Sequence, residues 1–547
     1  MRSTMQDAPL TIGSILRHGT TWYRDSEVIT AGASASRRAS YAEVGERAAR
    51  LANGLRRLGI TGDDRVGTFA WNNQEHLEAY LAIPSMGAVL HTLNIRLFPE
   101  QIVYIANHAE DQVVITDASL VPLLAKLLPE LTTVHTVLVA GEADTAPLEA
   151  AGKQVLAYES VLAAESSEFP WPDVDELSAA AMCYTSGTTG NPKGVVYSHR
   201  SAWLHSTAQC SGNGLAVRFD DRVLPIVPMF HANAWGLPYA ALMSGASLVM
   251  PDRFLQAEPL VRFIEAERPT LSGAVPTIWN DILQFMRSHP GHDLSSITRI
   301  GCGGSAVPRA LMQAFEREFD IRIIQAWGMT ETSPLASVAW APVGVEGERI
   351  WDYRSTAGRL LCGVEGRIVD DAGQVLPADG KSVGELEVRG PWVTGSYYKE
   401  DDPARFDRGW LRTGDVGNLD PLGYITLTDR AKDVIKSGGE WISSVDLETT
   451  LAAHPDIVEA AVVGVPDERW QERPLAAVVL KDGASATPAQ LRDWLAERVV
   501  RWWLPERWTL IESVPRTSVG KFDKKVIRQQ YAEGKLSVTE LAAPERG

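Results

Sequence analysis

The densest group of phosphate-binding residue types in this chain is the run from Tyr184 to Gly194, which reads Tyr-Thr-Ser-Gly-Thr-Thr-Gly-Asn-Pro-Lys-Gly. Glycines let backbone N–H groups approach an anion, and hydroxyl side chains add further donors. Lys193 adds a mobile positive charge suited to a polyphosphate. The run lacks the Lys-Ser or Lys-Thr of a Walker loop, and a polar surface hairpin is the alternative. Because these residue types lie so close together, we expect a phosphate-binding loop.

Three further charged residues could complete such a site, although they lie far from the loop in the sequence. Glu331 follows a threonine, whereas Asp415 and Lys521 each follow a glycine. A carboxylate can bind Mg²⁺ or accept hydrogen bonds from ribose hydroxyls, and a lysine can neutralise phosphate charge. Taken alone, the Thr-Glu pair is more typical of a helix start, the Gly-Asp pair of a turn, and the Gly-Lys pair of a solvated surface lysine. They can act together only if the elements between them bring them to one place.

The elements that must position these residues alternate between strands and helices. A capping box at Ser40 and Glu43, followed by an apolar face, predicts the first helix. The expected strands are residues 65–70, 113–115, 137–140, 270–274, 297–302 and 321–325, and the expected helices are residues 40–58, 74–86, 259–267 and 308–319. This alternation predicts an α/β fold with largely parallel sheets.

The last third of the chain changes in composition. Turn residues between short apolar segments predict a small β-rich unit at about residues 360–428, with strands at 384–389 and 424–428. Residues 429–547 predict an α+β domain, with helices at 445–453 and from 487 onward, and strands at 458–465 and 475–480. We therefore expect a large N-terminal domain, residues 1–428, made of α/β subdomains plus the β-rich unit, followed by a small C-terminal domain.

Composition and charge exclude several classes of protein. The chain has 547 residues, of which 45% are hydrophobic and 22% charged, and a net charge of -17. This is ordinary globular usage, and the acidic balance disfavours nucleic acid as a partner. The scattered cysteines include no CxxC pair and predict a reduced, cytoplasmic protein without structural zinc. No signal peptide is evident, and no apolar run approaches the length of a membrane span.

The run at 184–194 resembles the signature of the adenylate-forming enzymes, which include acyl-CoA synthetases, luciferases and peptide-synthetase adenylation domains. Six later motifs follow in the family's order, so chance is not a sufficient explanation. They are residues 303–306 (Gly-Gly-Ser-Ala), 325–332 (Gln-Ala-Trp-Gly-Met-Thr-Glu-Thr), 410–415 (Trp-Leu-Arg-Thr-Gly-Asp), 429–433 (Asp-Arg-Ala-Lys-Asp), 437–441 (Ser-Gly-Gly-Glu-Trp) and 515–521 (Pro-Arg-Thr-Ser-Val-Gly-Lys). Within the family, the run at 436–444 is most similar to bacterial medium- and long-chain fatty acid–CoA ligases.

The resemblance implies a two-step reaction with ATP and coenzyme A. A carboxylate attacks the α-phosphate of ATP to give acyl-AMP and pyrophosphate, and the thiol of coenzyme A then displaces AMP. Charge builds up on the phosphates in the first step, so cations are needed there. The resemblance also implies that the C-terminal domain is mobile and rotates about a hinge at Asp429 between the two steps.

Four residues are expected to act on the phosphates. By resemblance, Glu331 and Thr185 bind Mg²⁺ and take part in catalysis, and Thr330 hydrogen-bonds the α-phosphate. Lys521 is expected to swing in with the small domain and neutralise charge during adenylation.

Two residues are expected to hold the nucleoside. Asp415 is expected to accept hydrogen bonds from the ribose, and Trp327 to stack on adenine where many relatives have Tyr. The remaining residues expected to contact ATP or AMP are Ser186, Gly187, Thr188, Thr189, Gly190, Lys193, Gly304, Ser305, Ala306, Gln325, Ala326, Gly328, Arg430, Lys432, Lys436 and Trp441.

The run at 228–236 is expected to border the acyl site. His231 is placed near the substrate carboxylate, and Trp235 resembles the aromatic gate of the fatty-acid subgroup. A structural histidine and ordinary core packing are the alternatives. Val275 is expected to line the same channel. Since residues 230–239 contain no Asp or Glu that could pair a substrate ammonium, an uncharged acyl tail is favoured.

Ser437, Gly438 and Gly439 are expected to contact coenzyme A in the second step, because glycine lets backbone run beside the pantetheine arm. The aromatic and basic stretch at 501–504 predicts domain packing, with peripheral membrane contact as the alternative. A homodimer through the N-terminal region is a further expectation from the resemblance.

The favoured function is an ATP-dependent fatty acid–CoA ligase for medium- to long-chain acids. The first alternative is a fatty acyl-AMP ligase that loads a carrier protein. Such enzymes carry an extra segment before the hinge, and none is evident between residues 384 and 429. The second alternative is a non-catalytic AMP-binding protein, which would not need Lys193, Glu331, Asp415 and Lys521 together.

Overall fold

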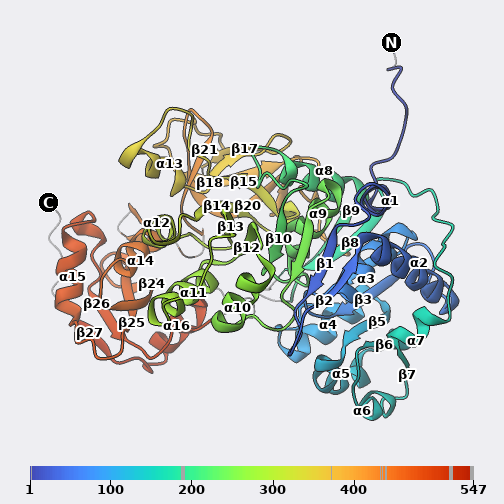
Figure 1. Cartoon of the computed structure of the whole chain (residues 1–547). Helices are drawn as coiled ribbons and strands as arrows, with labels where there is room; N and C mark the ends of the chain where they lie inside the picture. Colours follow the sequence, from blue (N-terminus) through green and yellow to red (C-terminus); the bar gives the residue numbers. More distant parts are fainter. Residues whose placement is uncertain are drawn as a thin grey trace.

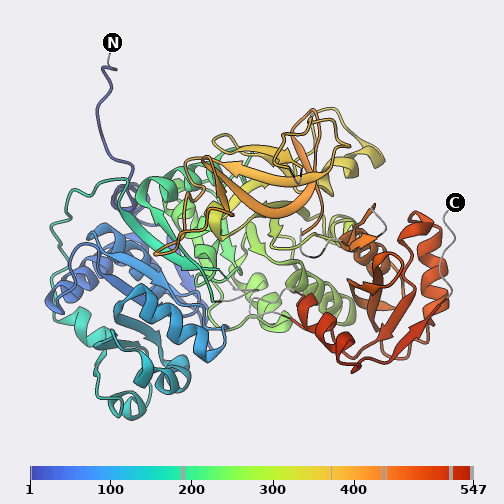
Figure 2. The same ribbon diagram turned by 180° about the vertical axis from the view of Figure 1, so that it is seen from behind.

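A computed structural model of the chain describes residues 1, 3–185, 191–370, 372–430, 433, 435–437, 440–516 and 522–541. For residues 429, 430, 436, 440 and 441, the backbone alone is described. Three sheets, of fourteen, seven and six strands, carry the fold of the described residues. Figures 1 and 2 show the domain of the six-stranded sheet at the opposite end of the molecule from the seven-stranded sheet.

The seven-stranded sheet leads into the expected phosphate loop. Its order is β7-β6-β5-β3-β4-β8-β9. Neighbouring strands are parallel except β8 and β9, which form an antiparallel pair. The strands are β3 (Arg65–Phe69), β4 (Val89–Thr92), β5 (Asp111–Asp117), β6 (Thr136–Ala140), β7 (Gln154–Ala157), β8 (Ala179–Tyr184) and β9 (Gly194–Ser198).

The fourteen-stranded sheet runs β17-β18-β20-β21-β16-β15-β14-β13-β12-β10-β11-β1-β2, with β19 beside β20. Strands β11, β10, β12, β13 and β14 are parallel, and pairing becomes antiparallel from β15 onward. The strands are β1 (Glu27–Thr30), β2 (Arg37–Ser40), β10 (Arg222–Pro225), β11 (Ser247–Met250), β12 (Leu271–Ala274), β13 (Arg299–Gly303), β14 (Arg322–Gly328), β15 (Leu335–Val338), β16 (Gly358–Leu360), β17 (Glu365–Val369), β18 (Gly384–Arg389), β19 (Phe406–Asp407), β20 (Trp410–Leu419) and β21 (Tyr424–Arg430).

The β-rich part expected at residues 360–428 does not form a sheet of its own. Its strands are present and antiparallel, but β16 pairs with β15 and so joins them to the parallel strands. In Figure 2 these strands curve over the top of the molecule. Sequence patterns identify strands but not their partners, so this continuity was not foreseen.

The C-terminal domain has its own sheet. Strand β21 ends in the large sheet at Arg430, and β22 begins in the small sheet at Ile435. Asp429, the expected hinge, is still paired with Val416 in the large sheet. The strands of the small sheet are β22 (Ile435–Ser437), β23 (Glu440–Ile442), β24 (Ile457–Asp467), β25 (Gln471–Leu480), β26 (Arg507–Leu510) and β27 (Val538–Glu540). A large α/β part and a small α+β domain are thus both present, as the sequence predicted.

The helices cover the faces of the sheets, and several begin where the sequence indicates. The capping box at the start of α2 forms, because Ser40 accepts from the N–H of Glu43 and Glu43 accepts from the N–H of Ser40. The helices are α1 (Ile12–Trp22), α2 (Tyr41–Arg57), α3 (Gln74–Ser85), α4 (Pro99–Ala109), α5 (Val121–Leu127), α6 (Ala146–Glu149), α7 (Tyr158–Ala163), α8 (His199–Cys210), α9 (Leu237–Ser244), α10 (Ala257–Glu267), α11 (Pro276–Ser288), α12 (Arg309–Phe319), α13 (Trp351–Arg354), α14 (Ser444–Ala452), α15 (Pro488–Ala496) and α16 (Lys524–Ala532).

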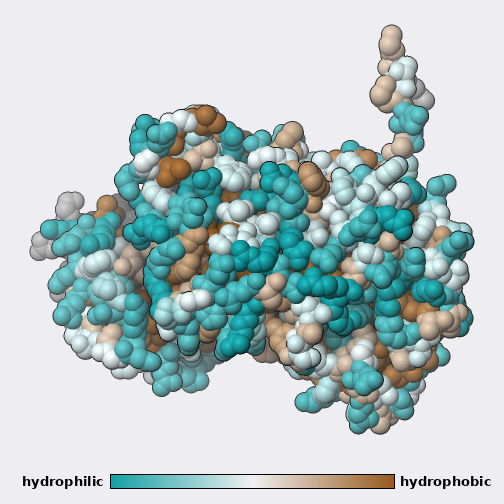
Figure 3. Space-filling model, viewed as in Figure 1, coloured by the Kyte–Doolittle hydropathy of each residue, from teal (hydrophilic) through white to brown (hydrophobic). Residues whose placement is uncertain are grey.

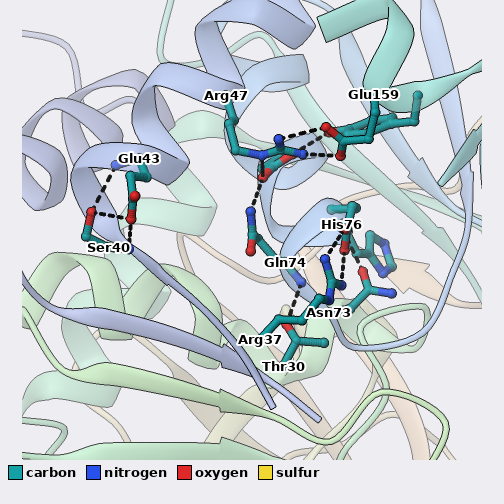
Figure 4. A network of polar contacts seen from close by, with 12 residues as sticks. Thr30, Arg37, Ser40, Glu43, Arg47, Asn73, Gln74, His76 and Glu159 are labelled. Carbon is teal, nitrogen blue, oxygen red and sulfur yellow. Dashed lines mark hydrogen bonds and ion pairs between the residues drawn. The ribbon is translucent and has the colours of Figure 1, made fainter. Parts of the chain in front are cut away.

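Helix α3 is buried along its whole length although it carries polar side chains. Fully buried Glu78 accepts hydrogen bonds from Arg47 at 2.5 Å, Tyr158 at 2.7 Å and Gln74 at 2.8 Å. Arg47 also binds Glu159 of α7, so the network joins α2, α3 and α7 (Figure 4). Buried charge is costly unless it is paired in this way. The backbone N–H of Gln74 donates to Thr30 Oγ1 of β1, so α3 also links the two large sheets.

Among the described residues, none of the helices combines the length and apolar composition that a membrane crossing requires. On the face shown in Figure 3, polar residues predominate and apolar residues form small groups. The stretch at 501–504 packs within the C-terminal domain: Leu504 is buried, and Trp502 and Trp503 lie half-buried against its core. These aromatic residues therefore take part in the packing of the domain.

Candidate active site

The expected phosphate loop connects two antiparallel strands. Tyr184 of β8 lies opposite Gly194 of β9. Just beyond this pair, the N–H of Thr185 donates to the carbonyl of Lys193 at 2.9 Å, and the N–H of Lys193 donates to Thr185 Oγ1 at 3.0 Å. The loop is thus closed at its base by residues of its own motif. Ser186, Gly187, Thr188, Thr189 and Gly190 lie outside the described residues.

Lys193 is held in place by three side chains that the sequence analysis did not single out. Its Nζ lies 2.7 Å from Asp402 and 2.9 Å from Glu400, and 4.8 Å from the ring centre of Tyr397. Burial opposes the charge, but the hydrogen bonds to both carboxylates outweigh it and raise the pKa of Lys193. The lysine is therefore a fixed cation at the loop. The dense Tyr-Tyr-Lys-Glu-Asp-Asp run at 397–402 was the available signal.

Tyr397 also connects Lys193 to Glu331. Its hydroxyl donates to Glu331 Oε1 at 2.7 Å, and Arg405 Nη2 lies 3.9 Å from the same oxygen. Burial, followed by the adjacent charge of Glu331, raises the pKa of Tyr397, so the phenol remains a donor. The expected phosphate-loop lysine and the expected magnesium ligand thus contact the same tyrosine, one at its ring and the other at its hydroxyl.

Glu331 is placed by a short 3-10 helix, η4 (Thr330–Thr332), that follows β14. The Thr330 carbonyl accepts from Tyr197 of β9 at 2.8 Å, and the Glu331 carbonyl accepts from the N–H of Thr394 at 2.8 Å. After burial, the charge of Glu331 helps to raise the pKa of Cys183, two residues before Thr185. Thr330 and Glu331 do begin a short helix, as the alternative interpretation of this Thr-Glu pair held. This helix places Glu331 beside the phosphate loop.

The oxygen ligands available near the loop fit a magnesium ion that is held mainly by the phosphate oxygens of a bound substrate. Mg²⁺ typically takes one or two protein carboxylates and completes its shell with phosphate oxygens and water. Glu331 is a single buried carboxylate, 5% exposed, close to the loop. Among the described residues there is no cluster of three or more His, Cys, Asp or Glu side chains suited to a metal. An ion at Glu331, with Thr185 as a second oxygen, would therefore depend on bound ATP.

Residues expected to contact the nucleoside lie where β13 and β14 end. These strands are parallel, with Gly303 opposite Ala326, so residues 304–306 and 327–328 lie at one edge. Ligands of open α/β sheets bind at such carboxyl ends. Gly304 has φ of +84°, in the left-handed region that favours glycine, and a Cβ on Gly303 would lie 2.5 Å from the Ala326 carbonyl. The backbones of the two strands are thus closely packed where they end.

Trp327 and Asp415 meet at this edge. Trp327 Nε1 donates to Asp415 Oδ2 at 2.8 Å, which joins β14 to β20. Asp415 is also paired through its backbone with Arg430 of β21. The expected adenine-stacking residue therefore also orients the expected ribose-binding carboxylate, a contact that sequence did not indicate.

The side chain of Gln325, a residue expected to contact ATP or AMP, is bonded to the protein backbone. Its Oε1 accepts from the N–H of Val307 at 2.7 Å, and its Nε2 donates to the carbonyl of Thr356 at 2.5 Å. The amide is thus bonded to protein backbone at both ends. Gln325 supports the 304–307 segment, whose residues Ser305 and Ala306 are exposed.

The segment expected at the acyl site has an unusual backbone. Residues 232–236, from Ala232 through Asn233, Ala234 and Trp235 to Gly236, all have positive φ, between +43° and +74°. Non-glycine residues rarely adopt this region in succession, because each costs roughly 1–2 kcal/mol. Strain of this kind persists where surrounding structure enforces it, often at functional sites.

Two contacts from other elements hold this left-handed segment. Gln209 Nε2 of α8 donates to the carbonyl of Trp235 at 2.7 Å, and Thr92 Oγ1 of β4 donates to Asn233 Oδ1 at 3.2 Å. His231 immediately precedes the segment, and the Trp235 ring lies near Gly273 of β12. Val275, half-buried, caps α11 beyond the same strand. The structure therefore places Trp235 and Val275 at the end of β12, and His231 directly before the left-handed segment.

Several expected residues lie outside the described part of the chain. These are Lys432, Gly438, Gly439 and Lys521, and the side chains of Arg430, Lys436 and Trp441. Ser437, the remaining expected coenzyme A residue, is fully buried at the end of β22, where its Oγ accepts from Arg473 at 3.1 Å.

Comparison with known proteins identifies the family. The model of the AMP-binding enzyme matches residues 18–398, and that of the AMP-binding enzyme C-terminal domain matches residues 446–521. The chain belongs to the AMP-binding enzyme family. This confirms the resemblance drawn from the motifs, and the two matched regions lie on either side of the change of sheet between residues 430 and 435.

Several relatives are similar to this AMP-binding enzyme over nearly its whole length. The 3-methylmercaptopropionyl-CoA ligase of Ruegeria pomeroyi is 41% identical, covering 97% of this chain and 99% of its own. The medium-chain-fatty-acid–CoA ligase of Ectopseudomonas oleovorans is 41% identical, with 97% and 98% covered. The long-chain-fatty-acid–CoA ligase of Thermus thermophilus is 43% identical, with 97% of each covered.

Solved structures confirm the fold class. The anthranilate CoA ligase AuaEII in complex with anthranoyl-AMP superposes with a TM-score of 0.86 at 25% identity, covering 97% of this chain and all of that one. ATP-bound MatB from Rhodopseudomonas palustris gives a TM-score of 0.79 at 25% identity, covering 95% and 99%.

Proposed function

We propose that this AMP-binding enzyme is an ATP-dependent acyl-CoA ligase that joins a medium- to long-chain fatty acid to coenzyme A through acyl-AMP. The relatives named above are acyl-CoA ligases at 41% identity or more over nearly the full chain. The observation that carries the proposal is the Lys193–Tyr397–Glu331 arrangement, which places a cation and a buried carboxylate on one ring beside the loop.

In the first step, the triphosphate lies along the loop. Lys193 exchanges contacts with Asp402 and Glu400 for contacts with phosphate oxygens, and Glu331 and Thr185 are the residues that would hold Mg²⁺. The ion supplies charge neutralisation on the phosphates when it is bound. Asp415 accepts from the ribose and Trp327 stacks on adenine, so the α-phosphate faces the substrate carboxylate. Lys521 enters with the C-terminal domain to stabilise the charge that develops there.

In the second step, the C-terminal domain presents a different face. Residues 437–439 come to the acyl-AMP, and the coenzyme A thiol attacks the acyl carbonyl. AMP leaves as a good leaving group, which the free carboxylate lacked. His231 lies at the start of the left-handed segment, where it would face the reacting carboxyl.

The acyl tail is uncharged in this proposal. Residues 230–239 provide no acidic side chain, and Trp235 borders the site with apolar neighbours on α9 and β12. Each buried methylene contributes about 0.8 kcal/mol. Affinity should therefore rise with chain length until the channel ends.

The experiment measures pyrophosphate release and coenzyme A consumption across saturated acids from short to long chain. It includes aryl acids and also 3-methylmercaptopropionate, because a relative 41% identical is named for that acid. We expect both signals with medium- and long-chain acids. Pyrophosphate release without coenzyme A consumption would favour a ligase that loads a carrier protein. No pyrophosphate release with any acid would contradict an adenylating function.

A further inference from the structure

Asn72 is a buried residue, 3% exposed, on the short connection between β3 and α3. Its Nδ2 donates to the carbonyl of Pro225 at 2.7 Å and to that of Val227 at 2.9 Å. Its Oδ1 accepts from the N–H of Met229 at 2.7 Å. Both N–H donors and the carbonyl oxygen of one amide are thus bonded to the backbone of a single segment, residues 225–229.

This segment leads the chain from the end of β10 to the expected acyl site. The N–H groups of Ile226 and Val227 donate to the carbonyl of Gly273 in β12, at 3.0 Å and 2.8 Å. Further along, the N–H of His231 donates to the carbonyl of Pro228 at 3.0 Å, and the left-handed segment follows directly. The position of residues 225–229 therefore determines where His231 and the left-handed segment begin.

Helix α3 adds a second contact to the same segment. Tyr80 is fully buried, and its hydroxyl donates to the carbonyl of Met229. Tyr239 of α9, which follows the left-handed segment, donates in turn to the carbonyl of Tyr80 at 3.0 Å, and the centres of the two rings lie 5.6 Å apart. The chain on both sides of the left-handed segment is therefore fastened to α3.

These contacts join the two large sheets at the ends of their strands. Asn72 follows β3 of the seven-stranded sheet, whereas residues 225–229 begin at the end of β10 in the fourteen-stranded sheet. The carbonyl of Asn72 also accepts from the N–H of Asp252, just beyond β11, at 2.9 Å. The seven-stranded sheet leads through β8 into the phosphate loop. Asn72 thus links the sheet that carries the loop to the segment that carries His231.

Such a link sets the distance between the two reactants. In the proposed first step, the phosphates of ATP lie along the loop, and the carboxylate of the acid lies near His231. A misplacement of about 1 Å between reacting groups can lower a rate by about 100-fold. In the second step the acyl carbonyl is already bonded to AMP, so the nucleotide itself helps to fix its position.

We propose that Asn72 is a positioning residue for acyl-AMP formation: it fixes residues 225–229, and through them His231, relative to the sheet that carries the phosphate loop. This inference rests on the proposed function, in which His231 faces the reacting carboxyl. Asn72 itself touches neither acid nor nucleotide in this proposal. Its loss should therefore slow the first step far more than the second and should leave ATP binding nearly unchanged.

The test measures both half-reactions of Asn72→Ala with the acid that wild type adenylates fastest. ATP–pyrophosphate exchange at varied ATP reports the first step, and thioester formation from supplied acyl-AMP and coenzyme A reports the second. We expect the maximal exchange rate to fall by about 10-fold to 100-fold, with the KM for ATP within about twofold of wild type. Thioester formation should stay within about threefold of wild type.

Asn73→Ala is the matched control. Asn73 is the next residue, 2% exposed, and its side chain accepts from the N–H of His76 and donates to Asp117, both at 2.9 Å. The variant therefore removes a buried amide of the same size whose bonds go to α3 and β5. We expect both variants to lower the melting temperature. The ratio of the two half-reactions should change in Asn72→Ala and stay unchanged in Asn73→Ala.

A milder pair of variants decides the matter should Asn72→Ala fail to fold. Tyr80→Phe keeps the ring and removes only the donor to Met229, so we expect exchange to fall by about threefold to tenfold with little change in thioester formation. Tyr41→Phe is its control, because Tyr41 is also fully buried and donates to a backbone carbonyl, that of Ala246. Ala246 lies at the amino end of β11, at the edge of the sheet opposite to residues 225–229.

The outcomes separate this inference from the proposed function. If wild type shows no exchange that depends on an added acid, the proposed function is wrong whatever the variants do. If wild type is active, unchanged exchange in Asn72→Ala, an equal loss in both of its half-reactions, or the same selective loss in Asn73→Ala would each overturn the role of Asn72. In the milder pair, equal behaviour of Tyr80→Phe and Tyr41→Phe would overturn it.

Discussion

At the scale of single residues, the indole of Trp327 distinguishes this site from one with Tyr at the same position. Its N–H fixes one oxygen of Asp415 before nucleotide binds, at 2.8 Å. A hydrogen bond to a charged group contributes about 1.5–3 kcal/mol. The carboxylate should therefore be held in the orientation that the ribose requires, at little further entropic cost on binding.

Trp327→Phe removes this N–H and retains an aromatic face for adenine. We expect the KM for ATP to rise by about tenfold, with a smaller change in the maximal rate of adenylation. Steady-state pyrophosphate release at varied ATP measures both. If the effect acts through the ribose, the variant and wild type should differ less with 2′-deoxy-ATP. An unchanged KM for ATP would show that the indole N–H does not orient Asp415.

Tyr397 is the second residue whose role emerges from contacts alone. Tyr397→Phe keeps the ring beside Lys193 but removes the donor to Glu331. Without this donor, Glu331 should hold Mg²⁺ less well oriented, so we expect adenylation to slow by about tenfold and to require more Mg²⁺. ATP–pyrophosphate exchange across a magnesium titration measures this. Thioester formation from supplied acyl-AMP serves as the internal control and should not change.

At the scale of elements, α8 supports the left-handed segment with Gln209 and His205. His205 Nε2 accepts from the N–H of Leu335 at 3.0 Å, which requires a neutral ring, and burial lowers its pKa from 6.5 to about 3. Its other ring nitrogen faces Gly236, where a Cβ would lie 2.6 Å from Nδ1. His205 of this helix thus lies against the left-handed segment, and its bond to Leu335 requires an uncharged ring.

This burial makes stability depend on pH with a defined sign. Between pH 6.5 and about 3, the unfolded chain binds a proton at His205 that the folded chain does not. The free energy of unfolding should therefore fall as the pH decreases through this window, by about 1.4 kcal/mol per pH unit at most. Burial also lowers the pKa of His199 in the same helix to about 4, so its contribution to the free energy of unfolding changes with pH in the same direction. Asp117 changes the free energy of unfolding in the opposite direction on acidification, since burial raises its pKa to about 7.

Because the histidines and Asp117 change the pH dependence of stability in opposite directions, the contribution of His205 is measured by comparing variants. Melting temperatures of wild type, His205→Gln and an exposed control, His18→Gln, are recorded from about pH 7.5 to pH 5. Glutamine can still accept from Leu335. We expect His205→Gln to lose less stability than wild type on acidification, and the control to follow wild type. Parallel curves for all three would rule out this contribution of His205.

At the scale of the whole molecule, the proposed site is divided between two domains. The loop, Glu331, Trp327 and Asp415 belong to the large sheets, whereas Lys521 belongs to the C-terminal domain matched by its own family model. In the proposed cycle, domain rotation decides which half-reaction can occur. The chain changes sheet between Arg430 and Ile435, directly after the proposed hinge at Asp429.

Lys521→Ala tests this division of labour. We expect acyl-AMP formation to fall by at least about 100-fold, because the charge on the α-phosphate is no longer neutralised. Thioester formation from supplied acyl-AMP should stay within about threefold of wild type. Pyrophosphate release and coenzyme A acylation measure the two steps separately. An equal loss in both would mean that Lys521 does not act in one orientation of the domain alone.

The sequence by itself determined the local elements and the family. The capping box at Ser40, the apolar strands and the ordered motifs are encoded by near neighbours along the chain, where periodicity and turn chemistry act directly. The loop at 184–194 and the carboxylates at 331 and 415 could be identified for the same reason, since each lies in a dense local pattern.

Only the tertiary structure decided how distant side chains meet. Tyr397 bridges Lys193 and Glu331, Trp327 bonds Asp415, and Arg473 reaches Ser437, and each contact joins strands or loops that are far apart in sequence. The left-handed backbone at 232–236 and the junction of β15 with β16 were likewise not readable from sequence. The physical reason is that pairing register, burial and backbone strain depend on packing among all elements at once, whereas sequence patterns report only what neighbouring residues favour.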